Sequence, residues 1–123
     1  MDGDEDQTYP AVADMDVYVQ VWAGGGELGA VKVNGKPVEK DPITGVGELK
    51  LGLGAGLKNT TVDIDAAFRR TNSLTDTAFL NVVFLQRMPA MDRPDFNRQK
   101  FEPLAAPFDG KSTTTLKTSV SVR

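Results

Sequence analysis

The sequence predicts an all-β fold: a single antiparallel β-sandwich, immunoglobulin-like or jelly-roll-like in shape, with a small β-barrel as the alternative. Three observations support this prediction. Apolar residues recur at every second position in several short segments, Gly and Pro separate these segments, and no segment shows a convincing long helical period. With 123 residues, the chain has the size of one domain that can bury a core.

The first predicted strand is marked by three alternating valines: Val17, Val19 and Val21. Val favours extended backbone because its branched Cβ restricts χ1 in a helix. A second strand leads into Asn34-Gly35, where both residues tolerate positive φ, and this pair predicts a tight hairpin. Pro37 follows the turn and cannot donate a backbone hydrogen bond, so the returning strand should be short or at an edge.

Four more segments carry strand patterns. Residues 49–53 and 62–68 alternate between apolar and polar or small residues, although Thr60 to Asp63 also has the form of a capping box that opens a short helix. Residues 79–85 are apolar on both faces and predict the central strand. Residues 116–122 alternate again and predict a closing strand with one face in water.

Charge divides the chain into three parts. Residues 1–16 hold six acidic and no basic side chains, residues 17–86 are neutral, and residues 87–123 have a net charge of +3. We therefore expect an acidic N-terminal arm at 1–16, followed by a β-sandwich domain at 17–123. Since the arm adds almost nothing to the strand pattern, removal of residues 2–14 should leave the melting temperature nearly unchanged.

The segment from Arg87 to Gly110 contains four of the seven prolines and has no sustained period. It predicts a long Pro-rich loop at 87–110, in which Asp95 could cap one helical turn over residues 96–101. The loop is rich in large apolar side chains, so we expect it to dock on something rather than to be disordered.

Composition excludes most familiar enzyme sites. The chain has no His and no Cys, which removes the commonest acid/base group, thiol nucleophiles, disulfides and Cys-type metal sites. An isoelectric point near 4.9 argues against nucleic-acid binding. The acidic N-terminus and the absence of a long apolar run predict no signal peptide and no membrane span in this chain.

Three patterns resemble chemical sites without completing one. Asp2, Asp4 and Asp6 have the spacing that begins a calcium loop, but the later ligands are missing. The glycines at 52–56 follow a strand without a phosphate-loop spacing, and a bulge or a close strand crossing explains them better. Asp63 and Asp65 share one side of a strand and are the only carboxylate pair worth naming for hydrolysis. We therefore expect no enzyme, no cofactor and no metal.

The favoured function is a non-enzymatic structural or interaction domain, a subunit of a larger protein assembly such as a virion or phage particle or a bacterial surface assembly. Its partners would be other protein subunits, in a homo-oligomer or a hetero-assembly, and a particle or a secreted or cell-surface location is favoured. The predicted interface residues lie in or beside the loop: Met88, Met91, Arg93, Phe96, Arg98, Phe101 and Phe108.

The alternative function is a carbohydrate or small-ligand binding module. Tyr18 and Trp22 share the second face of the first strand and could form a stacking platform for a glycan. Packing of these two rings against another sheet is the favoured interpretation, because Trp and Tyr are usually well buried.

Overall fold

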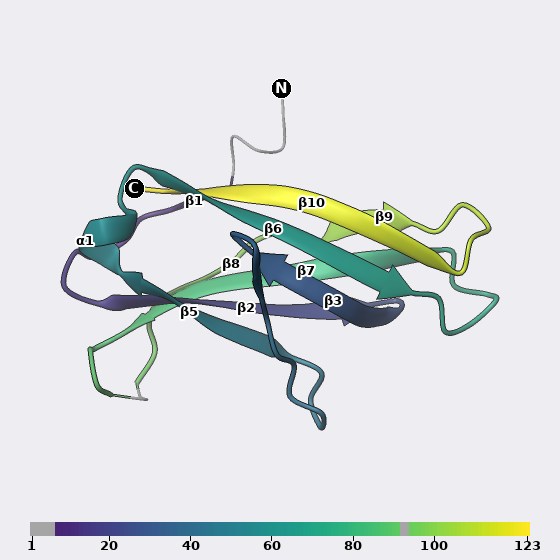
Figure 1. Cartoon of the computed structure of the whole chain (residues 1–123), viewed down its shortest axis with the longest axis horizontal. Coiled ribbons are helices and arrows are strands. Elements are labelled where there is room, and N and C mark those ends of the chain that lie inside the picture. Colours follow the sequence, from purple (N-terminus) through teal and green to yellow (C-terminus); the bar gives the residue numbers. More distant parts are fainter. Residues whose placement is uncertain (1–6, 92–93) are drawn as a thin grey trace.

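The computed structural model describes residues 7–91 and 94–123, and it shows a β-sandwich of two five-stranded sheets (Figure 1). The first sheet has the strand order β1-β10-β6-β3-β4, and the second has the order β5-β2-β7-β8, with β9 also paired to β7. Among the described residues the two sheets do not join into a closed barrel. The predicted β-sandwich is therefore confirmed.

The first sheet contains β1 (Thr8–Tyr9), β10 (Thr113–Val122), β6 (Thr60–Arg69), β3 (Glu27–Val33) and β4 (Lys36–Pro37). Strand β6 pairs along its whole length with β10 in an antiparallel register that places Lys117 opposite Asp65. The predicted strand at 62–68 is correct, and the alternative helix opened by Thr60 is wrong. Tertiary pairing on both sides of β6 favours the extended form over a short helical turn.

The second sheet contains β5 (Gly47–Leu53), β2 (Asp16–Gly24), β7 (Thr77–Arg87), β8 (Phe96–Lys100) and β9 (Leu104–Pro107). Strand β7 is central, as its apolar sequence predicted, because β2 pairs along one side and β8 and β9 pair along the other. A register shift between Val17 and Tyr18 lies opposite Gly52, in agreement with the bulge expected at the glycines.

The predicted hairpin joins β3 to β4. Asn34 and Gly35 have φ values of 50° and 80°, the left-handed conformations that a two-residue hairpin turn requires. The Asn34 side chain also accepts a hydrogen bond from the backbone N–H of Asp63 at 2.8 Å, and this bond ties the turn to β6. Pro37 lies in a two-residue edge strand, as expected.

The core lies between the inner faces of the sheets and is built by the alternating residues of each long strand. Phe84 of β7 is fully buried at its centre, where its ring lies 5.2 Å from that of Tyr9 and 5.7 Å from that of Phe101. Val83 and Leu85 are also fully buried, although they alternate with the core residues of β7 and lie outside the main core cluster. The outer face of the second sheet therefore also contains buried apolar side chains, Val83 and Leu85.

The expected arm boundary at residue 16 is wrong for the described residues. Tyr9 is fully buried, Gln7 and Ala11 are buried, and β1 pairs in parallel with the end of β10. The Tyr9 hydroxyl donates to the Asn97 carbonyl at 2.7 Å, and the Gln99 amide donates to the Thr8 carbonyl at 3.0 Å. Residues 7–16 therefore join the two sheets, while Asp2, Asp4 and Asp6 lie outside the described residues.

The expected long loop at 87–110 is also wrong. Strands β8 and β9 occupy much of this segment, and Asp95 precedes a strand instead of a helical turn. Phe101 and Phe108 are buried in the core. Of the described residues in this segment, 88–91, 94–95, 101–103 and 108–110 lie outside the strands.

A single helical turn, α1 (Gly54–Leu57), follows β5 and was missed in the sequence. The backbone of Gly54 donates to the Met15 carbonyl at 2.8 Å. A Cβ at Gly54 would lie 2.0 Å from the Val12 carbonyl oxygen, so the close approach of these two segments requires glycine. Among the described residues no helix has the length and apolar character that a membrane crossing needs.

Candidate functional site

An apolar surface covers the end of the sandwich at which β7 ends and β8 begins, on the left in Figure 1. Five of the eight large apolar side chains that are exposed in the described residues lie there, each between 41% and 51% exposed: Val12, Leu53, Met88, Met91 and Phe96. We call this set the end patch. The register accounts for its assembly, because Leu53 and Arg87 both pair with Asp16, while Phe96 pairs with Gln86.

The Gln86 side chain forms hydrogen bonds to the segment that carries Val12 of the end patch. Its side chain is fully buried and accepts a hydrogen bond from the Val12 N–H at 2.9 Å. Its amide nitrogen donates to the Val12 carbonyl at 3.0 Å, and Asn97 donates to the Gln86 side-chain oxygen at 3.3 Å. A buried amide with these partners fixes the segment that carries Val12 against β7 and β8.

Arg87 closes the base of the loop between β7 and β8. Its side chain is only 8% exposed, and its Nε lies 2.7 Å from Asp95 Oδ1 while its Nη2 lies 3.2 Å from Glu48 Oε1. The guanidinium also lies over the Tyr18 ring, 4.6 Å from the centroid. The loop that carries Met88 and Met91 therefore begins and ends at one ion pair, which holds its two ends together.

The ion cluster shifts the pKa values of Arg87 and Glu48. Burial alone would lower the pKa of Arg87, but the hydrogen bonds and charges of Asp95 and Glu48 outweigh burial and raise it. Burial alone would raise the pKa of Glu48, but hydrogen bonds from Gln20 and Arg87 and the Arg87 charge lower it below its usual value. Both shifts favour the charged forms.

This cluster predicts an acid-sensitive contribution to stability. Because the pKa of Glu48 is lower in the folded chain than in the unfolded chain, its contribution is complete above the unfolded pKa of about 4.5 and is lost as pH falls through the folded pKa. We expect the difference in melting temperature between the wild type and Glu48→Gln to shrink as pH falls below about 5. Thermal unfolding from pH 7 to pH 3 measures it; a difference that grows on acidification would contradict the lowered pKa.

The structure separates the predicted interface residues into two groups. Met88, Met91 and Phe96 are exposed in the end patch, and Arg98 is exposed on β8. Phe101 and Phe108 are core residues. The sequence pattern placed them in a loop because β8 and β9 were not recognised as strands. Arg93 lies outside the described residues.

Tyr18 and Trp22 lie on the outer face of the second sheet, so the expected packing of their rings against the other sheet is wrong. Both residues are half-buried. Arg87 covers one face of the Tyr18 ring, which reduces its use for stacking on a sugar. Trp22 pairs with Asn81, and the exposed Phe79 follows two residues away on β7.

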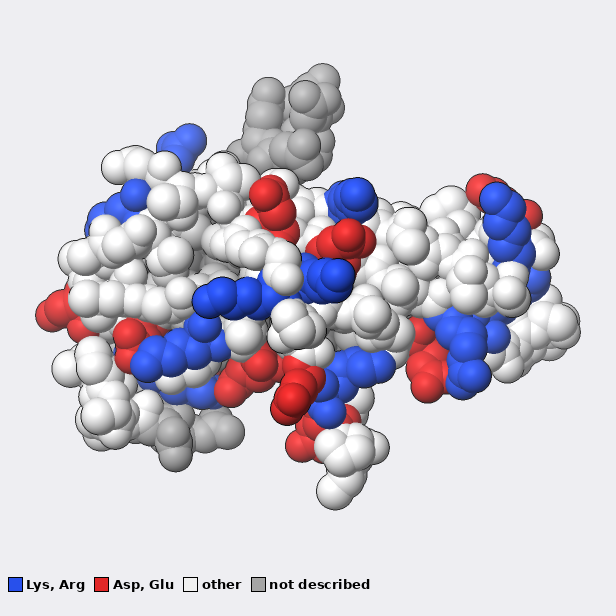
Figure 2. Space-filling model, in the orientation of Figure 1, with Lys and Arg blue, Asp and Glu red and all other residues white. Residues whose placement is uncertain are grey.

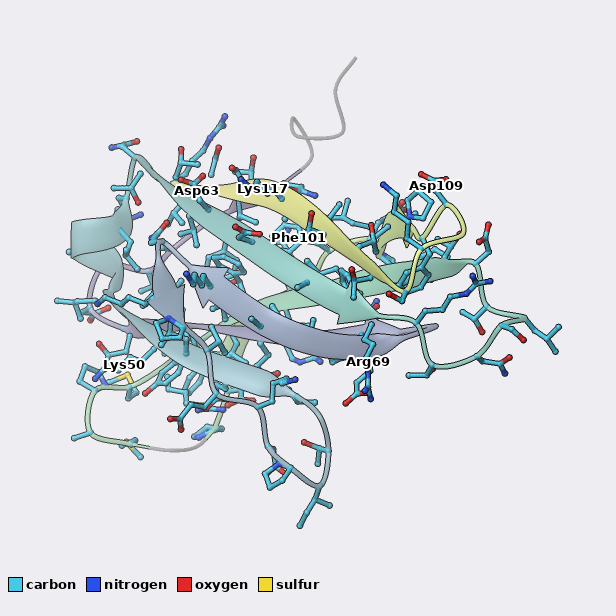
Figure 3. All side chains as sticks on the ribbon, turned by 45° about the vertical axis from the view of Figure 1, so that its right-hand side comes forward. Lys50, Asp63, Arg69, Phe101, Asp109 and Lys117 are labelled. Atoms are coloured by element: carbon cyan, nitrogen blue, oxygen red, sulfur yellow. The ribbon has the colours of Figure 1, made fainter. Side chains whose placement is uncertain are left out.

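Asp63 and Asp65 line a groove of about 490 Å³ on the outer face of the first sheet. Ser119 donates to Asp63 at 2.7 Å, while Lys32 and Lys117 lie on either side of Asp65 in the register. Figures 2 and 3 show basic and acidic side chains next to one another over this face. Both carboxylates are exposed, and no cluster of acidic ligands suited to a metal ion occurs in the part of the chain that the structure describes.

Sequence reasoning missed Val12, Leu53 and Gln86. The sequence pattern places Val12 in an arm and Leu53 in a half-buried strand, and the predicted central strand at 79–85 ends before Gln86. Only the strand register, which a single sequence does not give, brings these three residues to one end of the sandwich. The chain matches no protein family, no curated protein and no solved structure.

Proposed function

We propose that the domain is a non-enzymatic structural or interaction subunit, and that copies of it associate through the end patch to build a larger assembly. The observation that carries the proposal is that five of the eight exposed large apolar side chains of the described residues lie at one end of the sandwich. Monomeric proteins rarely expose contiguous apolar patches of large size, and such patches often mark protein contacts.

The support beneath the patch is consistent with a contact surface. Gln86 and Arg87 are buried and fully bonded, so Val12 and Met88 are presented by a fixed backbone. A preorganised surface loses less conformational entropy on association than a mobile one. Met and Phe are also residue types that are enriched in interface centres.

Light scattering of the whole chain over a range of concentrations tests self-association. We expect a concentration-dependent rise in mass for the wild type, and a monomer at every concentration for Met88→Ser combined with Phe96→Ser, because a few large apolar side chains supply most interface energy. The matched control is Leu74→Ser, an exposed apolar residue in the connection between β6 and β7, which should assemble like the wild type.

Two outcomes would contradict this proposal. If the wild type is a monomer at every concentration, the chain does not self-associate and the proposal is wrong. Normal assembly by the double variant would place the contact elsewhere. Both variants must keep the wild-type melting temperature within a few degrees, since the substituted side chains are exposed.

A glycan-binding role is the second candidate, supported by the position of Trp22 on an outer face. Trp22 pairs directly with Asn81, and Phe79 lies two residues from Asn81 on β7. Aromatic rings with a neighbouring amide suit a sugar ring. A glycan panel probed with the wild type and with Trp22→Ala distinguishes this role, because the assembly proposal expects no glycan dependence on Trp22.

A further inference from the structure

A polar hollow of about 330 Å³ lies at the end of the sandwich opposite the end patch. It is formed where the connection between β6 and β7 meets the connection between β9 and β10, on the right in Figure 1. Its lining includes two basic side chains, three hydroxyl groups and an amide: Arg70, Lys111, Thr71, Ser73, Ser112 and Asn72. No acidic residue and no aromatic residue belongs to this lining.

Arg70 is held in place by its own connection. Its Nε donates to the Thr75 carbonyl at 2.9 Å, and its Nη2 donates to the Ser73 carbonyl at 2.8 Å. These two bonds use part of the guanidinium, which has five N–H donors in a planar fork. The remaining donors are thus oriented before any ligand arrives.

The opposite wall comes from a tight turn. Asp109 and Gly110 both have left-handed backbone, and the Lys111 N–H donates to the Phe108 carbonyl at 3.0 Å. The Arg70 N–H donates to the Ser112 carbonyl at 2.8 Å, which joins the two connections. A Cβ at Gly110 would meet nothing within 4 Å, so this wall leaves open space for a ligand.

Two carboxylates lie near the hollow without lining it. Asp76 Oδ1 is 3.8 Å from Arg70 Nη2, and its side chain is 70% exposed. Asp109 is exposed at the tip of the turn, as Figure 3 shows. Exposed charges interact weakly in water, so they reduce the positive potential of the hollow without neutralising both of its basic side chains.

We propose that this hollow binds a tetrahedral oxyanion, the phosphate or sulfate group of a larger ligand. Arginine, lysine and hydroxyl donors around an open space are the groups that bind such anions, because each can donate a charge-assisted or short hydrogen bond to a different oxygen. The volume exceeds that of the anion alone and leaves room for the group that carries it. This inference does not depend on the proposed self-association.

Leu74 adds a second property to this end of the molecule. It is 90% exposed beside the hollow, and its N–H donates to the Asn72 side chain at 2.8 Å, which fixes the turn that presents it. An apolar tip next to a phosphate-binding group fits the headgroup region of an anionic lipid as well as it fits a soluble phosphorylated molecule. The shared chemistry is the oxyanion, and the experiment separates the two sources.

The test is a titration of the isotope-labelled whole chain with inorganic phosphate and then sulfate, at constant ionic strength and pH 7, followed by NMR. We expect saturable shifts of the backbone amides of Thr71, Ser73 and Ser112. Lys111→Gln should weaken binding about fivefold or more, and Asp76→Asn should strengthen it about twofold, from the loss of one attractive or one repulsive charge. Lys111 makes no side-chain bond within the described residues, so its substitution should not disturb the fold.

Lys36→Gln is the matched control, because Lys36 is an exposed lysine on β4, away from both connections. A second arm uses vesicles of phosphatidylcholine, alone or mixed with phosphatidylglycerol. Capture by the mixed vesicles that is lost in Leu74→Ser identifies a lipid headgroup; phosphate binding without capture identifies a soluble ligand. The proposal is overturned if neither probe binds saturably, or if Lys111→Gln and Lys36→Gln bind alike.

Discussion

Replacement of Phe84 by Ala should lower the free energy of unfolding by about 3 to 5 kcal/mol, the range for buried aromatic side chains. Phe84 is fully buried in the central strand, and its ring contacts those of Tyr9 and Phe101. The change therefore removes the ring contacts to Tyr9 of β1, in the first sheet, and to Phe101, which directly follows β8, and it leaves a cavity in the core. A loss of this size approaches the total stability of a marginal domain, so much of the variant should be unfolded or insoluble.

Urea denaturation of the soluble fraction measures the effect, with Phe79→Ala as the matched control on the same strand. Phe79 is 41% exposed on the outer face, so its truncation should cost less than about 1 kcal/mol. Equal denaturation midpoints for the wild type and Phe84→Ala would remove Phe84 from the core and with it the assignment of β7 as the central strand.

The sequence predicts a strand wherever one face of that strand is buried and the other is exposed to solvent, because apolar and polar residues then alternate. Val17, Val19 and Val21 follow this rule, and so does the segment that forms β10. Asn34-Gly35 fixes one hairpin through local backbone preference alone. These features depend on neighbours in the chain, so a single sequence reveals them.

Strands β8 and β9 cannot be predicted from apolar alternation, because their local sequences lack it. Strand β8 has mostly exposed side chains, a register shift on β7 and a left-handed residue at Asn97, so apolar alternation is absent. Strand β9 has four residues and ends at Pro107, a residue that the sequence rules assign to loops. Pairing with β7, which is already present, stabilises both segments in spite of their weak local preference.

The candidate surfaces were only partly visible in the sequence. Met88, Met91 and Phe96 stood out because large apolar residues outside a strand pattern are unusual. Val12 and Leu53 join them only through pairing with distant segments. The polar hollow gave no signal in the sequence, since Arg70 and Lys111 are 41 residues apart and the polar residues beside them resemble ordinary loop residues.

Replacement of Tyr9 by Ala should cost about 3 to 5 kcal/mol, although the charge pattern places Tyr9 in an acidic arm. Its ring is fully buried against Phe84, and its backbone belongs to the strand pair that joins the N-terminal segment to β10. Burial raises the pKa of the Tyr9 hydroxyl, so the group is protonated at neutral pH and donates to the Asn97 carbonyl.

Tyr9→Phe separates the ring from the hydroxyl. It keeps the packing against Phe84 and removes only the donor to Asn97, so we expect a loss of about 1 to 2 kcal/mol. If Tyr9→Ala has the same melting temperature as the wild type, residues 7–16 are an appendage, and the two sheets are held together without them.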